Sequence, residues 1–303
     1  MSRVFEGIFP PISSFFTEDF KIDKESFKKQ IDFLIENGVD GIFFLGTGGE
    51  FSQMSTDERK EIAEFAVKYV NHRVKVLIGV GTTNMREAIE LSLHAKECQA
   101  DGIVAINPYY WKVTPEKLCN YFSKIAQSVN PLPVIMYNFP NLTGQDLDPN
   151  FVKEVVIKNP NVVGIKETID SIGHITSMIN TVCAVNPDFA VFNGFDNHFL
   201  TNLMAGGAGM ISASGNFAPY YSVATYKYFK EGNIAKACET FATLMKMPEI
   251  YALDNPFVNV VKEATKLCAL KDISTAVLPP SLPLTDEKRA QLKEILLKLK
   301  LIK

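Results

Sequence analysis

The chain has 303 residues, a net charge of −3 and 47% hydrophobic residues, which is enough apolar material for one large domain or two small ones. The slight acidity argues against a nucleic-acid partner, because no excess of Lys and Arg is present to neutralise phosphates. No apolar run approaches the ~20 residues of a membrane span, and the first residues lack the apolar segment of a signal peptide, so neither a membrane protein nor a secreted one is predicted.

Along the chain, short apolar strands alternate with amphipathic helices about eight times. Strands bounded by Gly, Pro or Asn are predicted at residues 7–10, 41–45, 76–80, 102–106, 134–137, 162–166, 190–193 and 209–212. Apolar strands separated by helices are typical of a parallel sheet covered by helices. Eight such units before residue 230 predict an α/β fold of the closed (β/α)₈ TIM-barrel class. A doubly wound open sheet is the alternative.

Several helices carry recognisable start signals. A helix over residues 55–69 opens with Ser55-Thr56-Asp57-Glu58, which has the form of a capping box. The pairs Thr114-Pro115 and Asp148-Pro149 combine an N-cap residue with a proline in the first turn. After residue 214 only helices are predicted, at 219–230, 233–247, 256–268 and 286–301. We therefore expect a barrel over residues 1–230 and a C-terminal helical appendage over residues 231–303.

Lys166 ends the apolar run of residues 161–166, which is typical of a buried parallel strand. Burial disfavours the charged form of an amine, and a neutral lysine near pH 7 is a nucleophile toward ketones that can form a Schiff base. The alternative is a lysine whose stem packs on the strand while its amine extends into water.

Polar and aromatic residues follow several of the predicted strands, and barrel active sites lie at the carboxyl ends of strands. Tyr137 ends the strand before that of Lys166, so its phenol is expected one strand spacing away, ~4.8 Å. There it can transfer protons, and the hydroxyl of Thr47 can relay them. A core tyrosine at the barrel mouth is the alternative for Tyr137.

The turn Gly46-Thr47-Gly48-Gly49 can direct several backbone N–H groups at one anion, a carboxylate or a phosphate. A tight turn without a ligand is the alternative. A dinucleotide fingerprint is not predicted, because Gly79-Val80-Gly81 lacks the third glycine. Gly206-Gly207-Ala208-Gly209 precedes the eighth strand and is assigned to a turn, with phosphate binding as the alternative.

Among the charged residues, Glu50 and Glu167 are weaker candidates, since each can be a helix-start carboxylate. Asp57, Glu58 and Arg59 are interpreted as solvated surface. The five cysteines are odd in number and widely spaced, which is typical of reduced thiols in a cytoplasmic protein. The four histidines have no metal-ligand spacing, and His94 and His174 are interpreted as surface or satisfied residues.

Four motifs carry a resemblance that covers nearly the whole chain: Gly46-Thr47-Gly48-Gly49-Glu50, Tyr137-Asn138-x-Pro140, Gly164-Ile165-Lys166 and Gly206-Gly207-x-Gly209. In this order they resemble the dihydrodipicolinate synthase / N-acetylneuraminate lyase superfamily of class I pyruvate-dependent aldolases. The resemblance implies that Lys166 forms a Schiff base with a 2-oxo acid, that Tyr137 is the acid and base, and that Thr47 joins the relay.

The same resemblance implies the remaining site residues. Gly46, Thr47, Gly48 and Gly49 hold the oxo-acid carboxylate, while Ile211, Leu142 and Gly194 line the substrate site. Tyr110 resembles the tyrosine that family members insert into a neighbouring subunit's site, which implies a homo-oligomer, a tetramer built as a dimer of dimers.

Two departures from the synthase pattern bear on the substrate. Leu142 stands where dihydrodipicolinate synthases have an arginine that holds the second substrate's carboxylate, and Gly48 stands where they have a second threonine. Leucine cannot make the bidentate contact of arginine. The stretches 44–53 and 211–219 most resemble the bacterial 2-keto-3-deoxygluconate aldolases of this superfamily.

The expected function is therefore a class I aldolase that cleaves or forms a 2-keto-3-deoxy sugar acid, with pyruvate and an aldehyde as the other partners. No cofactor and no metal are predicted, because the lysine imine supplies the electron sink. The alternatives are 4-hydroxy-tetrahydrodipicolinate synthase, sialic-acid cleavage, a keto-deoxy sugar acid dehydratase, a phosphate-sugar barrel enzyme and a non-catalytic pyruvate-binding barrel.

Overall fold

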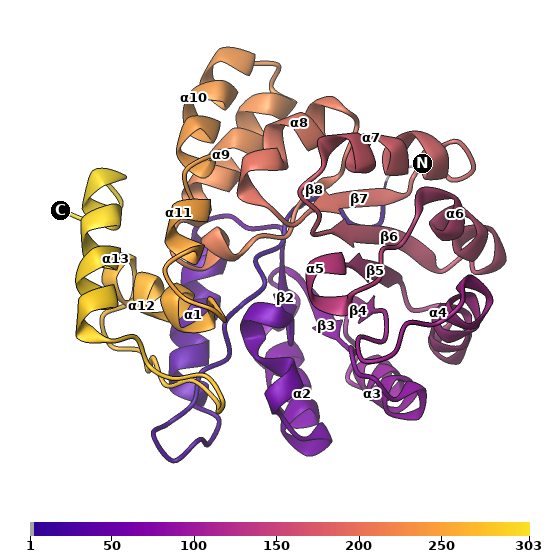
Figure 1. The fold of residues 1–303 in the computed structure, drawn as a ribbon, viewed down its shortest axis with the longest axis horizontal. Coiled ribbons are helices and arrows are strands. Elements are labelled where there is room, and N and C mark those ends of the chain that lie inside the picture. The colour runs from indigo at the N-terminus through magenta and orange to yellow at the C-terminus, as the bar shows by residue number, and fades with distance from the viewer. Residues whose placement is uncertain (1–2) are drawn as a thin grey trace.

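A parallel barrel forms the centre of the computed structural model, which describes residues 3–303 (Figure 1). Its strands are β1 (Gly7–Ile8), β2 (Gly41–Phe44), β3 (Lys75–Gly79), β4 (Gly102–Ile106), β5 (Val134–Asn138), β6 (Val162–Glu167), β7 (Ala190–Asn193) and β8 (Gly209–Met210). They pair in parallel in the order β1-β8-β7-β6-β5-β4-β3-β2, and a bridge between Pro11 and Phe43 joins the two ends. The predicted TIM barrel is confirmed, and the doubly wound alternative is wrong.

Helices surround the strands as an outer layer (Figure 1). They are α1 (Lys24–Glu36), α2 (Thr56–Val70), α3 (Met85–Glu97), α4 (Pro115–Val129), the short α5 (Pro140–Thr143), α6 (Pro149–Lys158), α7 (Ile172–Cys183), α8 (Phe199–Met204) and α9 (Pro219–Lys230). The predicted start signals are confirmed: Ser55 and Glu58 form a capping box, and Thr114 and Asp148 cap α4 and α6. Each cap accepts backbone N–H groups that the first turn of a helix leaves unpaired.

Phenylalanines fill part of the barrel interior. The rings of Phe9 and Phe192 meet edge to face with 5.6 Å between centroids, and both side chains are buried. A β-carbon added to Gly209 would lie 1.9 Å from the carbonyl oxygen of Gly7, so only glycine permits β8 to pair with β1 here. Gly206 and Gly207 lie in the turn before β8, and their carbonyl oxygens accept hydrogen bonds from the Arg3 guanidinium.

The C-terminal region consists of α10 (Ile234–Leu244), α11 (Pro248–Tyr251), α12 (Val258–Cys268) and α13 (Asp286–Lys298). Helix α10 packs against α9, and α12 packs against the 3₁₀ turn η1 (Thr47–Gly49) that follows β2. The C-terminal region therefore reaches the carboxyl end of the barrel. Within the described residues, every helix is too short or too polar to span a lipid bilayer.

Some details differ from the sequence-based predictions. Strand β1 ends at Ile8, two residues early, because Pro10 and Pro11 have no N–H to donate to a ladder. Arg59 is buried, not solvated: its guanidinium lies 5.3 Å from the centroid of the Phe51 ring and donates to the carbonyl oxygen of Gly79. Glu167 is the last residue of β6 and does not start a helix.

Candidate active site

Lys166 and Tyr137 are neighbours on adjacent strands. The parallel register of β5 and β6 places Tyr137 directly opposite Lys166, as the sequence predicts. Both side chains are buried, and the Lys166 Nζ lies 4.2 Å from the centroid of the Tyr137 ring and 5.3 Å from that of Phe43. Among the ion pairs of residues 3–303, none includes Lys166. The amine is therefore not committed to a carboxylate and can react once it is deprotonated.

Thr47 joins this pair from another part of the barrel. Its Oγ1 lies 3.1 Å from the phenol oxygen of Tyr137, and either hydroxyl can donate. Thr47 opens the turn after β2, whereas Tyr137 belongs to β5, so the contact brings together residues 90 positions apart. Two hydroxyl groups in contact beside an amine provide a path for a proton.

The turn after β2 is built to leave N–H groups free. Gly49 donates to the carbonyl of Gly46 at 3.0 Å, and Glu50 donates to that of Thr47 at 3.1 Å. The N–H groups of Thr47 and Gly48 lie in the first turn, where a helix has no internal partner for them. Within the described chain, neither donates to a backbone carbonyl. Free N–H groups at the start of a turn attract an anion.

Leu142 faces a small cavity beside Thr47. The cavity measures about 140 Å³ and is lined by Thr47, Phe51, Ser52, Ile106, Tyr109, Leu142 and Thr143. Leu142 belongs to α5 and is 55% exposed. The position at which synthases have an arginine is therefore next to the catalytic candidates.

Ile211 and Gly194 lie at the same end of the barrel as Lys166, directly after β8 and β7. Ile211 is buried, and a β-carbon on Gly194 would lie 2.2 Å from Thr168 Oγ1. Thr168 Oγ1 and Asn197 Oδ1 are buried atoms without a hydrogen-bond partner in the described part of the chain. Buried polar atoms are seldom left unpaired, so these two are an unusual feature of this end of the barrel. Sequence analysis did not assign these two residues, although both follow strands that it predicted.

A polar cluster that runs from buried Asn138 and Glu167 to exposed Asp146 joins the ends of β5 and β6. Asn138 Nδ2 donates to Asp146 Oδ1 at 2.7 Å and to Glu167 Oε2 at 3.0 Å. His174 Nε2 lies 3.1 Å from Asp146 Oδ2, and its Nδ1 lies 3.4 Å from Glu167 Oε2. Asp146 and Glu167 together raise the pKa of His174 to about 10, while burial raises the pKa of Glu167. A protonated His174 therefore ties Asp146, in the segment after α5, to Glu167 at the end of β6.

Tyr110 is the candidate that the single chain does not bring to the site. It lies on the loop after β4, is 83% exposed, and packs only loosely against Trp111, with 6.5 Å between ring centroids. The structure therefore brings Lys166, Tyr137, Thr47, the glycine turn and Leu142 together, and leaves Tyr110 outside.

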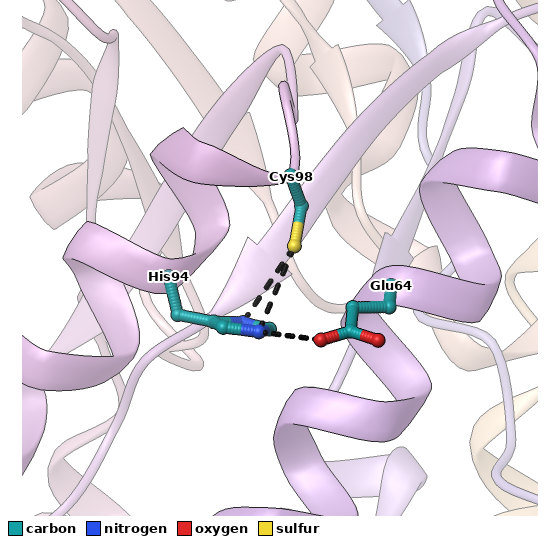
Figure 2. Close-up of side chains that lie close together, drawn as sticks. All are labelled: Glu64, His94 and Cys98. Atoms are coloured by element: carbon teal, nitrogen blue, oxygen red, sulfur yellow. Dashed lines mark hydrogen bonds and ion pairs between the residues drawn. The ribbon is translucent and has the colours of Figure 1, made fainter.

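A separate cluster of Glu64, His94 and Cys98 lies between α2 and the end of α3 (Figure 2). His94 Nε2 is already 3.0 Å from Glu64 Oε1. Cys98 Sγ is 3.7 Å from His94 Nδ1 and 3.8 Å from Nε2, so the sulfur is aimed at neither nitrogen lone pair. Metal ligands must direct their lone pairs at one point, and this arrangement does not do so.

Comparison with known proteins gives a consistent result along the chain. The Dihydrodipicolinate synthetase family model matches residues 4–299. "Putative 2-dehydro-3-deoxy-D-gluconate aldolase YagE" of Escherichia coli (strain K12) is 54% identical over 300 residues, which are 99% of each chain. "Probable 2-dehydro-3-deoxy-D-pentonate aldolase YjhH" of the same strain is 51% identical over 294 residues, 97% of each chain.

A 4-hydroxy-tetrahydrodipicolinate synthase of Methanopyrus kandleri is more distant, 35% identical over 96% of this chain and 94% of its own. Among solved structures, the crystal structure of YagE in complex with pyruvate superposes with a TM-score of 0.96 and covers 98% of this chain and 99% of that one, at 54% identity. The YagE structure shares the fold of the chain, and each of these relatives matches it over nearly its whole length.

Proposed function

The chain belongs to the dihydrodipicolinate synthetase family, and we propose from this that it is a class I aldolase of 2-keto-3-deoxy sugar acids, a pyruvate-dependent carbon-carbon lyase. The observation that carries the proposal is the buried Lys166 amine opposite Tyr137, with the Thr47 hydroxyl 3.1 Å from the phenol. The aldolase names of the two relatives above 50% identity and the pyruvate complex of YagE support it.

The reaction begins when the neutral Lys166 Nζ attacks the C2 ketone, and loss of water gives a protonated imine. Tyr137 removes the proton of the C4 hydroxyl, the C3–C4 bond breaks, and its electron pair moves into the imine to form an enamine. The aldehyde leaves, C3 takes up a proton, and water hydrolyses the imine to pyruvate and free lysine. Run backwards, the same steps join pyruvate to an aldehyde.

Electron demand in this scheme is met by the imine itself. The protonated nitrogen accepts the electron pair that other aldolases place on a metal-bound oxygen, so we propose that the reaction needs neither a metal nor an organic cofactor. The free N–H groups of Thr47 and Gly48 hold the carboxylate of the oxo acid next to Lys166, and Ile211 and Gly194 complete the pocket wall.

The aldehyde side of the pocket suits a hydroxylated chain better than a second carboxylate. Leu142 contributes an apolar surface to the cavity beside Thr47. Leucine at this position cannot pair with a second carboxylate as an arginine would. This favours sugar acid cleavage over the synthase reaction, in which a carboxylate-bearing aldehyde must be held.

The acceptor preference gives a direct prediction for Leu142. Leu142→Arg is expected to raise kcat/KM for carboxylate-bearing aldehydes relative to polyol aldehydes by about 10-fold, because a guanidinium binds a carboxylate through two charged hydrogen bonds. Condensation rates of pyruvate with a matched pair of aldehydes measure the ratio, and Leu142→Met controls for loss of the native side chain. An unchanged ratio would show that residue 142 does not contact the acceptor.

The assembly and location are proposed on separate grounds. Tyr110 and Trp111 are exposed aromatic side chains on one loop, 83% and 74% exposed. We propose a homotetramer, a dimer of dimers, in which Tyr110 completes the site of a neighbouring subunit. The five cysteines are free thiols, which fits a cytoplasmic enzyme.

Borohydride trapping tests the function as a whole. Incubation with pyruvate and borohydride is expected to add one reduced pyruvate per chain, and peptide mapping is expected to find it on Lys166. Pyruvate release from a series of 2-keto-3-deoxy acids, sialic acid and a phosphorylated analogue then identifies the substrate class. Cleavage releases pyruvate and dehydration does not, so this assay distinguishes the two reactions. A pyruvate adduct without turnover of any substrate would favour the non-catalytic pyruvate-binding barrel.

A further inference from the structure

Glu50 occupies a special position next to the carboxylate-binding turn. It ends the 3₁₀ turn Thr47–Gly49 and begins the next one, η2 (Phe51–Gln53), with a left-handed backbone of φ 57° and ψ 27°. Leu45, just before the turn, is also left-handed, with φ 59°. Residues other than glycine disfavour this conformation, so both ends of the turn must be held in place by surrounding contacts.

The contacts that hold Glu50 come from the C-terminal region. Lys262 of α12 donates from Nζ to Glu50 Oε1, and the N–H of Leu278 donates to Glu50 Oε2 at 2.7 Å. The same Lys262 amine donates to the carbonyl of Ala276 at 2.6 Å and lies 5.0 Å from the centroid of the Phe16 ring. The side chains of Lys262 and Glu50 are 0% and 3% exposed.

A buried ion pair of this kind does not by itself indicate a gain in stability. Removing two charges from water costs about as much as their attraction returns, and apolar residues of similar size often serve as well. Such a pair does favour one conformation of the segments that carry it, because any other conformation would leave a buried charge unpaired. Here the conformation is that of the turn, whose first residue, Thr47, contacts Tyr137.

We propose that Lys262 is a positioning residue for pyruvate binding, which acts through Glu50 to hold the N–H groups of Thr47 and Gly48 toward the carboxylate. The role rests on the proposed function, since it presumes that the turn binds an oxo acid. It makes the C-terminal region part of the active-site structure, because Lys262 and Leu278 both bind Glu50 at the end of the turn.

The test compares pyruvate saturation in variants of the full-length protein. Lys262→Met keeps the length and apolar stem of the side chain and removes the charge. We expect the pyruvate concentration for half-maximal borohydride trapping to rise by about 10-fold or more, because small displacements of positioning groups are costly. The extent of trapping at saturation is expected to stay near that of the wild type, because Lys166 is untouched.

A second variant separates positioning from stability. Glu50→Gln/Lys262→Met removes both charges and relieves the unpaired carboxylate, so its melting temperature is expected to recover while its weakened pyruvate saturation persists. This double variant also stands in for Lys262→Met if the single variant does not fold. Lys288→Met breaks the Lys288–Asp254 ion pair of the same region and is expected to leave pyruvate saturation unchanged.

The outcomes are distinguishable. A wild-type protein that traps no pyruvate overturns the proposed function and this inference with it. A second outcome is that the wild-type protein traps pyruvate and the double variant needs a half-saturating pyruvate concentration within about two-fold of the wild type. This outcome overturns the positioning role alone, since it would mean that Lys262 and Glu50 affect folding only.

Discussion

Lys166→Ala is expected to lower the rate of sugar acid cleavage by about 10⁴-fold or more, because no other group can form the imine. The Lys166 amine lies between the rings of Tyr137 and Phe43 and has no carboxylate partner among the ion pairs of residues 3–303. Alanine removes the nucleophile and leaves the neighbouring strands in place. Borohydride trapping with pyruvate and release of pyruvate from a keto-deoxy acid both measure the loss.

Two further variants exclude trivial causes of that loss. Lys166→Arg retains a long cationic side chain, yet a guanidinium stays protonated and cannot form the imine, so it is expected to be as inactive as alanine. Lys68→Ala removes an exposed lysine of α2 and is expected to be fully active. Melting curves confirm folding. If Lys166→Ala still cleaved substrate, or if the adduct mapped to another lysine, the mechanism would be wrong.

The barrel and the central residues could be predicted from the sequence because their signals are local. Strands β4 and β7 have the predicted bounds, since Gly102 and Ala190 begin apolar runs and polar residues end them. Once each strand is placed, the rule that parallel strands end at one side brings Lys166 and Tyr137 together without any knowledge of the packing.

The parts that escaped prediction depend on contacts between distant segments. Glu50 has the position of a helix-start carboxylate in the sequence, but its partner Lys262 is 212 residues away and belongs to a helix whose pattern indicates only amphipathic packing. Arg59 follows the acidic residues Asp57 and Glu58 in the sequence and is nonetheless buried against Phe51. Periodicity shows which face of a helix is apolar, but it does not show which charged side chain meets a buried partner.

Tyr137→Phe is expected to lower kcat for cleavage by about 10²- to 10⁴-fold, the usual contribution of a positioned acid or base. The change keeps the ring that packs beside Lys166 Nζ and against Phe139, and removes only the hydroxyl. Pyruvate trapping at saturation is expected to persist, because the nucleophile is unchanged. A loss of kcat with retained trapping would place Tyr137 at the proton-transfer step, and loss of trapping would instead indicate a role in holding Lys166.

Thr47 extends this test from one residue to the relay. Thr47→Val keeps the shape of the side chain and removes the hydroxyl 3.1 Å from the phenol, and is expected to lower kcat by about 10- to 100-fold. If the two hydroxyls transfer the same proton in sequence, the Thr47 hydroxyl can affect kcat only while the Tyr137 phenol is present. Tyr137→Phe/Thr47→Val should then be no slower than Tyr137→Phe alone. Independent, multiplicative losses in the double variant would mean that Thr47 acts on the substrate carboxylate and not on the proton.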